Sequence, residues 1–146
     1  MKNLFESINV LLVDDDQEDC DLTVEILEMS KVKVSIEIVH DGVEAMEFLE
    51  KNKNNPKKFP DLILLDLNMP RMNGHEVIAA LKKDECLAKI PIVVLTTSDA
   101  ESDISKTYSG GVNCYVTKPV GLSQFQKVVD SISNFWFTVV KYPTAN

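Results

Sequence analysis

The sequence has few of the features that mark secreted or membrane-spanning proteins. It contains three cysteines, Cys20, Cys86 and Cys114, which are widely spaced and fit no metal-ligand pattern. Such cysteines are typical of reduced thiols in a cytoplasmic protein. No apolar run approaches the roughly 18 residues of a membrane-spanning helix. The first residues lack the apolar segment and the cleavage site of a signal peptide. We therefore expect a soluble, cytoplasmic protein that does not bind membranes.

Basic residues are also few, because 15 lysines and arginines face 23 acidic residues and leave a formal net charge of −8. This excess of negative charge argues against nucleic acids and anionic membranes as partners. It favours a cation, or a basic patch on another protein. The chain also lacks an internal repeat, a low-complexity tract and an interdomain linker. Its 146 residues therefore predict one domain with a hydrophobic core.

Segments typical of strands and of helices alternate along the chain. Short apolar runs between turn residues predict strands at 8–13, 34–39, 62–66, 92–96 and 112–117. Apolar residues at helical spacing predict helices at 16–29, 43–51, 74–84 and 98–108, and a last helix that begins near residue 121. This alternation is typical of an α/β fold, in which helices cover both faces of a parallel sheet.

Polar residues follow four of the predicted strands. In a parallel α/β sheet, ligands bind beyond the carboxyl ends of the strands, and the residues at these ends are Asp14, Asp15, Asp66, Thr96, Thr97 and Lys118. Two charges roughly 4 Å apart repel by about 4 kcal/mol at an effective dielectric constant near 20. Neighbouring carboxylates at this edge therefore need protons or a cation. Carboxylates, a backbone carbonyl and water form the oxygen shell that Mg²⁺ prefers.

These residues have complementary roles in phosphoryl transfer. Asp66 could act as the nucleophile, because aspartyl phosphate is established carboxylate chemistry. A bound Mg²⁺, the Lys118 ammonium and the Thr96 hydroxyl could each neutralise or hydrogen-bond one phosphoryl oxygen. Each feature alone has a simpler explanation, since acids after a strand often begin a helix, whose dipole favours them, and a single Asp often only ends a strand. Their position at one edge of the sheet favours a phosphoryl or metal site.

Four stretches of the sequence, LLVDDD, PDLILLDLNMPRMNG, IPIVVLTTS and NCYVTKP, together resemble the receiver domain of two-component response regulators. The resemblance covers nearly the whole chain. It implies a flavodoxin-like, doubly wound sheet of five parallel strands in the order 2-1-3-4-5, with five helices. It also implies a single receiver domain over 1–146, with a core of about 6–130, a C-terminal helix extension over about 131–146 and no output domain.

The resemblance assigns the acids to phosphoryl acceptance and metal binding. Asp66 would be the phosphorylated residue. Asp15 would bind Mg²⁺ directly and Asp14 through water, and Asp66 and the backbone carbonyl of Asn68 would complete the site. The resemblance also implies that a sensor histidine kinase donates the phosphoryl group. Asp66 would take part in its own phosphorylation and later hydrolysis, so the protein would not be an enzyme that acts on other molecules.

The remaining motif residues would bind the phosphoryl group and respond to it. Thr96, with Thr97 beside it, and Lys118 would contact the phosphoryl oxygens. Tyr115 would be the aromatic switch residue that turns inward when Thr96 moves. The peptide bond between Lys118 and Pro119 would be cis, which would aim the lysine at the site.

The C-terminal sequence GLSQFQKVVDSISNFWFTVVKYP carries apolar residues at heptad-like spacing. We predict one long helix that reaches about Val140 and ends before Pro143. A short strand over 135–140 is the alternative, because aromatic and β-branched residues are frequent there. The apolar end extends beyond a compact receiver and predicts a symmetric homodimer built on the fourth helix, fifth strand and last helix. The expected interface residues are Phe135, Trp136, Phe137, Val139 and Val140. This tail also resembles stand-alone regulators of bacteriophytochrome-type histidine kinases.

Three other functions fit the motifs less well. Phosphatases of the haloacid dehalogenase type also use an aspartate nucleophile, Mg²⁺ and a lysine, but their nucleophile follows the first strand in a D-x-D-x-T/V motif that 14–18 does not match. A receiver-like scaffold that binds partners without phosphorylation would not need the complete set of motif residues. A flavin carrier is disfavoured because the acidic turn after the first strand would repel the flavin phosphate.

Overall fold

Strands and helices alternate in the computed structural model, which describes residues 7–29, 33–97, 101–119 and 121–136. The strands are β1 (Ile8–Val13), β2 (Val34–Val39), β3 (Leu62–Leu65), β4 (Ile92–Thr96) and β5 (Cys114–Thr117). The helices are α1 (Gln17–Glu28), α2 (Gly42–Lys51), α3 (Gly74–Lys82), α4 (Glu101–Ser109) and α5 (Leu122–Asn134). A short 3₁₀ helix, η1 (Leu87–Lys89), precedes β4, and the apolar spacing did not predict it.

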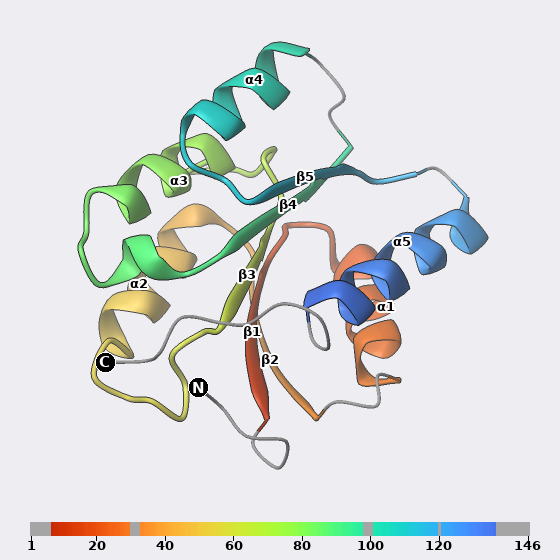
Figure 1. The fold of residues 1–146 in the computed structure, drawn as a ribbon, viewed down its shortest axis with the longest axis horizontal. Coiled ribbons are helices and arrows are strands. Elements are labelled where there is room, and N and C mark those ends of the chain that lie inside the picture. Colours follow the sequence, from red (N-terminus) through yellow and green to blue (C-terminus); the bar gives the residue numbers. More distant parts are fainter. Residues whose placement is uncertain (1–6, 30–32, 98–100, 120, 137–146) are drawn as a thin grey trace.

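The five strands form one parallel sheet in the order β2-β1-β3-β4-β5, which confirms the predicted doubly wound, flavodoxin-like topology. Helices α1 and α5 cover one face of the sheet, and α2, α3 and α4 cover the other (Figure 1). Parallel strands need such crossover helices, because a short turn cannot return the chain to the start of the next strand. No helix in the described part of the chain is long and apolar enough to cross a membrane.

The alternation of side chains along the strands divides the core into two apolar layers. Leu62 and Leu64 of β3 belong to the layer that α1 and α5 cover. Ile63 and Leu65 belong to the layer under α2 and α3. All four side chains are fully buried, which explains why 62–65 is an unbroken apolar run. Because β3 is the central strand, the residue that follows it emerges in the middle of the carboxyl edge of the sheet.

Helix α5 corresponds to the first part of the helix predicted to reach about Val140. Its last residue is Asn134, although Phe135 keeps a helical backbone with φ −69° and ψ −52°. This backbone argues against a strand that begins at residue 135. The expected helical continuation, with the predicted interface residues Phe137, Val139 and Val140, lies outside the described residues.

Trp136 belongs to the core of its own chain rather than to the predicted dimer interface. Its side chain is 7% exposed and packs in the layer that α1 and α5 cover. Trp136 follows Ile132 by one helical turn, so it continues the face of α5 that covers the sheet. Phe135 is 52% exposed, and its ring meets that of Trp136 edge-on with centroids 5.6 Å apart. The spacing predicts an apolar stripe, but it cannot distinguish the chain's own sheet from a second chain.

Candidate functional site

The strand register brings Asp14 and Asp66 to the same edge of the sheet. Val13 of β1 pairs with Leu65 of β3, so the residues that follow them are neighbours. Carboxylate oxygens of Asp14, Asp15 and Asp66 all lie within 4.8 Å of one another. Asp14 and Asp66 are buried, whereas Asp15 is exposed. The structure therefore gathers the three predicted metal-binding carboxylates into one group that solvent reaches from the side of Asp15.

The turn between β1 and α1 fixes the orientation of Asp14. The Oδ1 atom of Asp14 accepts a hydrogen bond from the backbone N–H of Asp16 at 3.0 Å. The N–H of Asp14 donates to the Val39 carbonyl of β2 at 3.1 Å. Asp16 is the N-cap of α1, and its side chain accepts the N–H of Asp19 at 3.1 Å. The third acid of the DDD run therefore begins the helix and leaves Asp14 and Asp15 beside Asp66.

Lys118 is buried among these acids. Its Nζ atom lies 2.5 Å from Oδ2 of Asp14, 3.0 Å from Oδ2 of Asp19 and 3.8 Å from Oδ2 of Asp66. The backbone N–H of Lys118 donates to the Thr96 carbonyl at 2.6 Å, which fixes the point where the lysine leaves the sheet. One ammonium therefore lies close to three carboxylates, and its nearest partner is Asp14 rather than Asp66.

Burial and neighbouring charges shift the protonation of this pair. Loss of solvent raises the pKa of Asp14 to about 6, and the charge of Asp66 adds to the rise, although hydrogen bonds from Lys118 and from the Asp16 N–H oppose it. Burial alone would lower the pKa of Lys118, but its hydrogen bond to Asp14 and the charges of Asp14 and Asp66 raise it above its ordinary value. Lys118 is therefore positively charged at neutral pH. One positive charge does not balance the acids around it, and their oxygen-only donor set fits Mg²⁺.

The loop after Asp66 makes close backbone contacts at two glycines, Gly42 and Gly74. A Cβ atom on Gly74 would lie 2.5 Å from the Asp66 carbonyl oxygen, and one on Gly42 would lie 2.4 Å from the Met72 carbonyl oxygen. The Gly42 N–H donates to the same Met72 carbonyl at 3.0 Å. Both positions therefore require glycine for close backbone approach. These contacts fix the loop relative to β3 and to the start of α2.

Acids after β1 and β3, a threonine at the end of β4 and a lysine after β5 thus meet at one edge of the sheet. Residues 10–130 match the family model of the response regulator receiver domain. The chain belongs to this family. It is 42% identical over 139 residues to response regulator Rcp1 of Synechocystis sp. (strain ATCC 27184 / PCC 6803 / Kazusa), over 93% of this chain and 93% of that protein.

Two solved structures of receivers are similar over almost the whole chain. The phosphorylated cyanobacterial phytochrome response regulator RcpA is 42% identical with a TM-score of 0.89, over 94% of this chain and 99% of that chain. The Mn²⁺-bound form of response regulator Rcp1 is 41% identical with a TM-score of 0.88, over the same shares. The similarity therefore extends from the sheet to the connections that carry the acids.

The other residues expected in the receiver site differ in exposure. Thr96 is buried at the end of β4 and pairs with Thr117 of β5, whereas Thr97 is exposed. The N–H of Asn68 lies 3.4 Å from Oδ1 of Asp66. This contact keeps the backbone of Asn68 close to the acid group.

Tyr115 connects β5 to α4, the helix that follows β4. Its side chain is half-buried and packs against the layer under α2 and α3. Its N–H donates to the hydroxyl of Tyr108 on α4 at 3.1 Å. A second link joins α4 to α3, where Nε2 of His75 lies 2.9 Å from Oδ1 of Asp103. Polar contacts thus supplement the small apolar stripe that the sequence of α4 provides.

The peptide bond between Lys118 and Pro119 corrects one prediction. No peptide bond within the described residues is cis, so Lys118 reaches Asp14 from a trans bond. The trans form of a bond before proline is favoured by about 0.5–1 kcal/mol. The backbone hydrogen bond from Lys118 to Thr96 already directs the lysine to the edge of the sheet. The expected cis bond came from the motif alone, and this geometry does not require it.

Asp19 also contacts the buried lysine of the receiver site, although it belongs to none of the motifs. Its carboxylate lies 3.0 Å from the Lys118 ammonium, in the first turn of α1. The only available signal was its position near the start of a predicted helix, where the helix dipole favours acids. The sequence could not show that Lys118, which is 99 residues away, would contact this residue.

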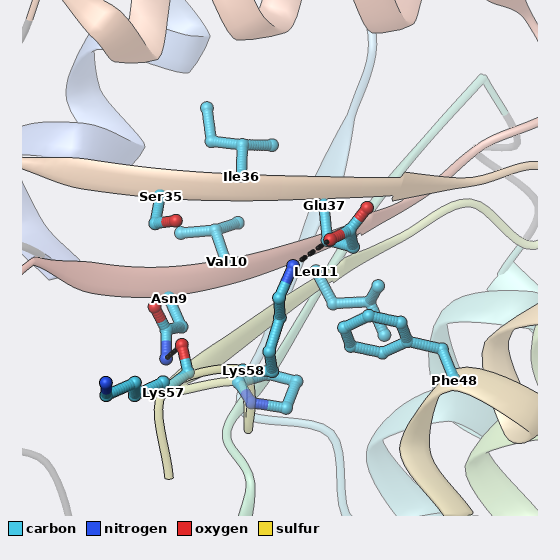
Figure 2. A pocket seen from close by; sticks show the side chains of 10 residues that line it. Asn9, Val10, Leu11, Ser35, Ile36, Glu37, Phe48, Lys57 and Lys58 are labelled. Atoms are coloured by element: carbon cyan, nitrogen blue, oxygen red, sulfur yellow. Dashed lines mark hydrogen bonds and ion pairs between the residues drawn. The ribbon is translucent and has the colours of Figure 1, made fainter. Parts of the chain in front are cut away.

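A small surface hollow lies near the amino-terminal ends of β1 and β2 (Figure 2). The Asn9 side chain donates there to the carbonyls of Lys57 and Phe59, both at 3.0 Å. An ion pair between Lys58 and Glu37 spans 3.3 Å. These polar groups therefore bind one another, and the hollow lies at the opposite ends of the strands from the acids. It is separate from the receiver site.

Proposed function

We propose that this receiver accepts a phosphoryl group on Asp66 in a Mg²⁺-dependent reaction and signals through conformational change and contacts with other proteins. One observation carries the proposal: three carboxylates lie within 4.8 Å of one another, and the Lys118 ammonium lies between Asp14 and Asp66. A divalent cation would neutralise this concentration of negative oxygens. The ammonium supplies positive charge where a phosphoryl group on Asp66 would lie.

The proposed ligands of Mg²⁺ are Asp14, Asp15, Asp66 and the backbone carbonyl of Asn68. Their fit rests on the donor set, which consists of oxygens and is open to water beside the exposed Asp15. The bound ion would supply positive charge against the phosphoryl oxygens. The Mn²⁺-bound form of the similar regulator Rcp1 supports a divalent cation in receivers of this kind.

In the proposed step, a carboxylate oxygen of Asp66 attacks the phosphorus atom of a phosphohistidine. The new O–P bond forms as the P–N bond breaks, and the electron pair of the broken bond stays on the imidazole nitrogen. Lys118 and the hydroxyl of Thr96 would bind the transferred oxygens, because both residues are buried at this edge of the sheet. Later attack by water would release inorganic phosphate and restore the carboxylate. The chain would thus act on itself and not on other substrates.

The proposed donor is a sensor histidine kinase of the phytochrome type. The support is the similarity to RcpA, which is a phytochrome response regulator.

We also propose that two copies of the chain form a homodimer through α4, β5 and α5. Three large side chains with apolar surface are exposed on these helices, Tyr108, Leu122 and Phe135. Burial between two chains would remove this surface from water.

Incubation with acetyl phosphate and Mg²⁺ tests the proposed function. Mass spectrometry of the intact chain should show one added phosphoryl group, which chelation of the metal should prevent. Asp66→Asn is the matched control, because it keeps the shape of the side chain and removes the nucleophile. A modification that survives this substitution would place the acceptor elsewhere. A wild-type chain that is never modified would favour a receiver-like scaffold that binds partners without phosphorylation.

A further inference from the structure

The Lys118 ammonium is shared unequally among its acids. Its distances to Asp14 and Asp19, 2.5 Å and 3.0 Å, are those of charged hydrogen bonds, whereas Asp66 is 3.8 Å away. Asp19 lies in the first turn of α1, whereas Asp66 follows the central strand β3. The ammonium is thus drawn toward α1 and does not donate to the proposed acceptor.

We propose that Asp19 is a positioning residue that holds Lys118 in a resting position, away from Asp66. This inference rests on the proposed phosphorylation of Asp66. A phosphoryl group on Asp66 would have to attract the ammonium away from Asp19 before Lys118 could contact it. The Asp19 carboxylate therefore stabilises the unphosphorylated arrangement relative to the phosphorylated one.

The exposure of the two partners limits the size of this effect. The side chain of Lys118 is 4% exposed, whereas that of Asp19 is 31% exposed. When Lys118 leaves, water can solvate the Asp19 carboxylate, so the lost contact is partly replaced. Asp19 should consequently bias the position of the lysine without locking it.

A general effect of helix charge would give a different pattern. Acids in the first turn of a helix interact favourably with its dipole, and both Glu18 and Asp19 lie in the first turn of α1. Glu18 is exposed, whereas Asp19 contacts Lys118. Glu18→Gln is therefore a matched control, because it removes the same charge from the same turn without removing that contact.

The first test uses trifluoroberyllate with Mg²⁺ as a non-covalent substitute for the phosphoryl group. Calorimetric titration should show that Asp19→Asn binds it about two- to fivefold more tightly than Glu18→Gln does, the range expected for a partly exposed ion pair. Asp19→Glu, which restores the charge, should return the affinity toward that of the wild type. Equal affinity in Asp19→Asn and Glu18→Gln, or weaker binding in Asp19→Asn, would overturn the proposal.

The second test is independent of phosphorylation and metal. In a double-mutant cycle, Asp19→Asn should lower the melting temperature of the wild type but not that of Lys118→Ala, where it relieves repulsion among acids. Absence of this coupling would overturn the proposal. If the coupling is present but the chain cannot be phosphorylated, the proposed function is wrong. The interaction by which Asp19 positions Lys118 would still be supported.

Discussion

Asp41 and Arg71 join the start of α2 to the loop after Asp66 through one carboxylate. The Nε and Nη2 atoms of Arg71 lie 2.8 Å and 2.7 Å from Oδ2 of Asp41. Oδ1 of Asp41 accepts the N–H of Glu44 at 2.9 Å and caps α2. The Glu44 N–H and the Arg71 guanidinium lower the pKa of Asp41, against the effect of burial. Arg71 makes this contact from a left-handed backbone, with φ 62°.

Two substitutions of Arg71 should distinguish the contribution of the ion pair to stability from the cost of the strained backbone. Arg71→Ala and Arg71→Gly both remove the guanidinium, but only glycine adopts a positive φ without steric cost. We expect Arg71→Gly to be more stable than Arg71→Ala by about 1 kcal/mol. Chemical denaturation of the two variants measures this difference. Equal stability would show that the loop relaxes its backbone once the ion pair is lost.

Gly74→Ala should disturb the loop that carries the proposed metal ligand Asn68. The new Cβ would lie 2.5 Å from the Asp66 carbonyl oxygen, so the loop must shift, at a cost of roughly 1–3 kcal/mol in unfolding free energy. Mg²⁺ affinity, measured by calorimetry, should fall as well. Gly121→Ala is the control, because the nearest atom to its Cβ would be 4.0 Å away. Similar losses in both variants would refute the steric explanation.

Mg²⁺ binding should weaken in acid, because a proton and the cation compete for Asp14. Burial raises the pKa of Asp14 to about 6, so below this pH the folded chain increasingly holds a proton there. Apparent Mg²⁺ affinity should fall by up to about tenfold per pH unit below the pKa and stay level well above it. Asp14 affects the free energy of unfolding in the opposite direction. Because its pKa is raised in the folded chain, it stabilises the fold at low pH, and this contribution is lost as the pH rises through about 6.

Calorimetric titrations on both sides of this pKa measure the effect. Asp14→Asn should remove the dependence in this range, because the amide does not titrate. A wild-type affinity that does not change across the pKa would show that Asp14 takes no part in metal binding.

Phe135 and Trp136 are adjacent, but their substitutions should have different effects. Trp136→Glu places a charge in the core and should cost roughly 3 kcal/mol or more in unfolding free energy. Phe135→Glu changes an exposed side chain and should alter stability by less than about 0.5 kcal/mol. Size-exclusion chromatography over a range of concentrations should show a wild-type dimer that Phe135→Glu weakens. A wild-type monomer at every concentration would remove the dimer from the proposal.

The sheet and the acid cluster could be predicted because their signals are local. The apolar run 62–65 has to be a strand buried on both faces, and parallel pairing places the residue after it beside the residue after β1. Neither prediction depends on the rotation of a helix about its own axis. For this reason Asp14, Asp15 and Asp66 could be expected together before the structure was known.

The contacts that the sequence did not reveal depend on packing between distant segments. Asp19 meets Lys118 only because of the rotation of α1 against the end of β5. Trp136 turns toward its own sheet, although the same spacing would serve an interface between two chains. The bond before Pro119 is trans, although the motif predicts a cis bond. Short-range sequence patterns carry no information on these three points.

The position of β2 at the edge of the sheet affects how the protein behaves at high concentration. Within the described part of the chain, β2 has a neighbouring strand on one side only, and such an edge is a template on which a strand from another molecule can add. Glu37 places a charge on this strand, where it pairs with Lys58 at 3.3 Å. Charged side chains on an edge strand discourage growth of the sheet from one molecule to the next. This border should therefore help to prevent fibrillar aggregation.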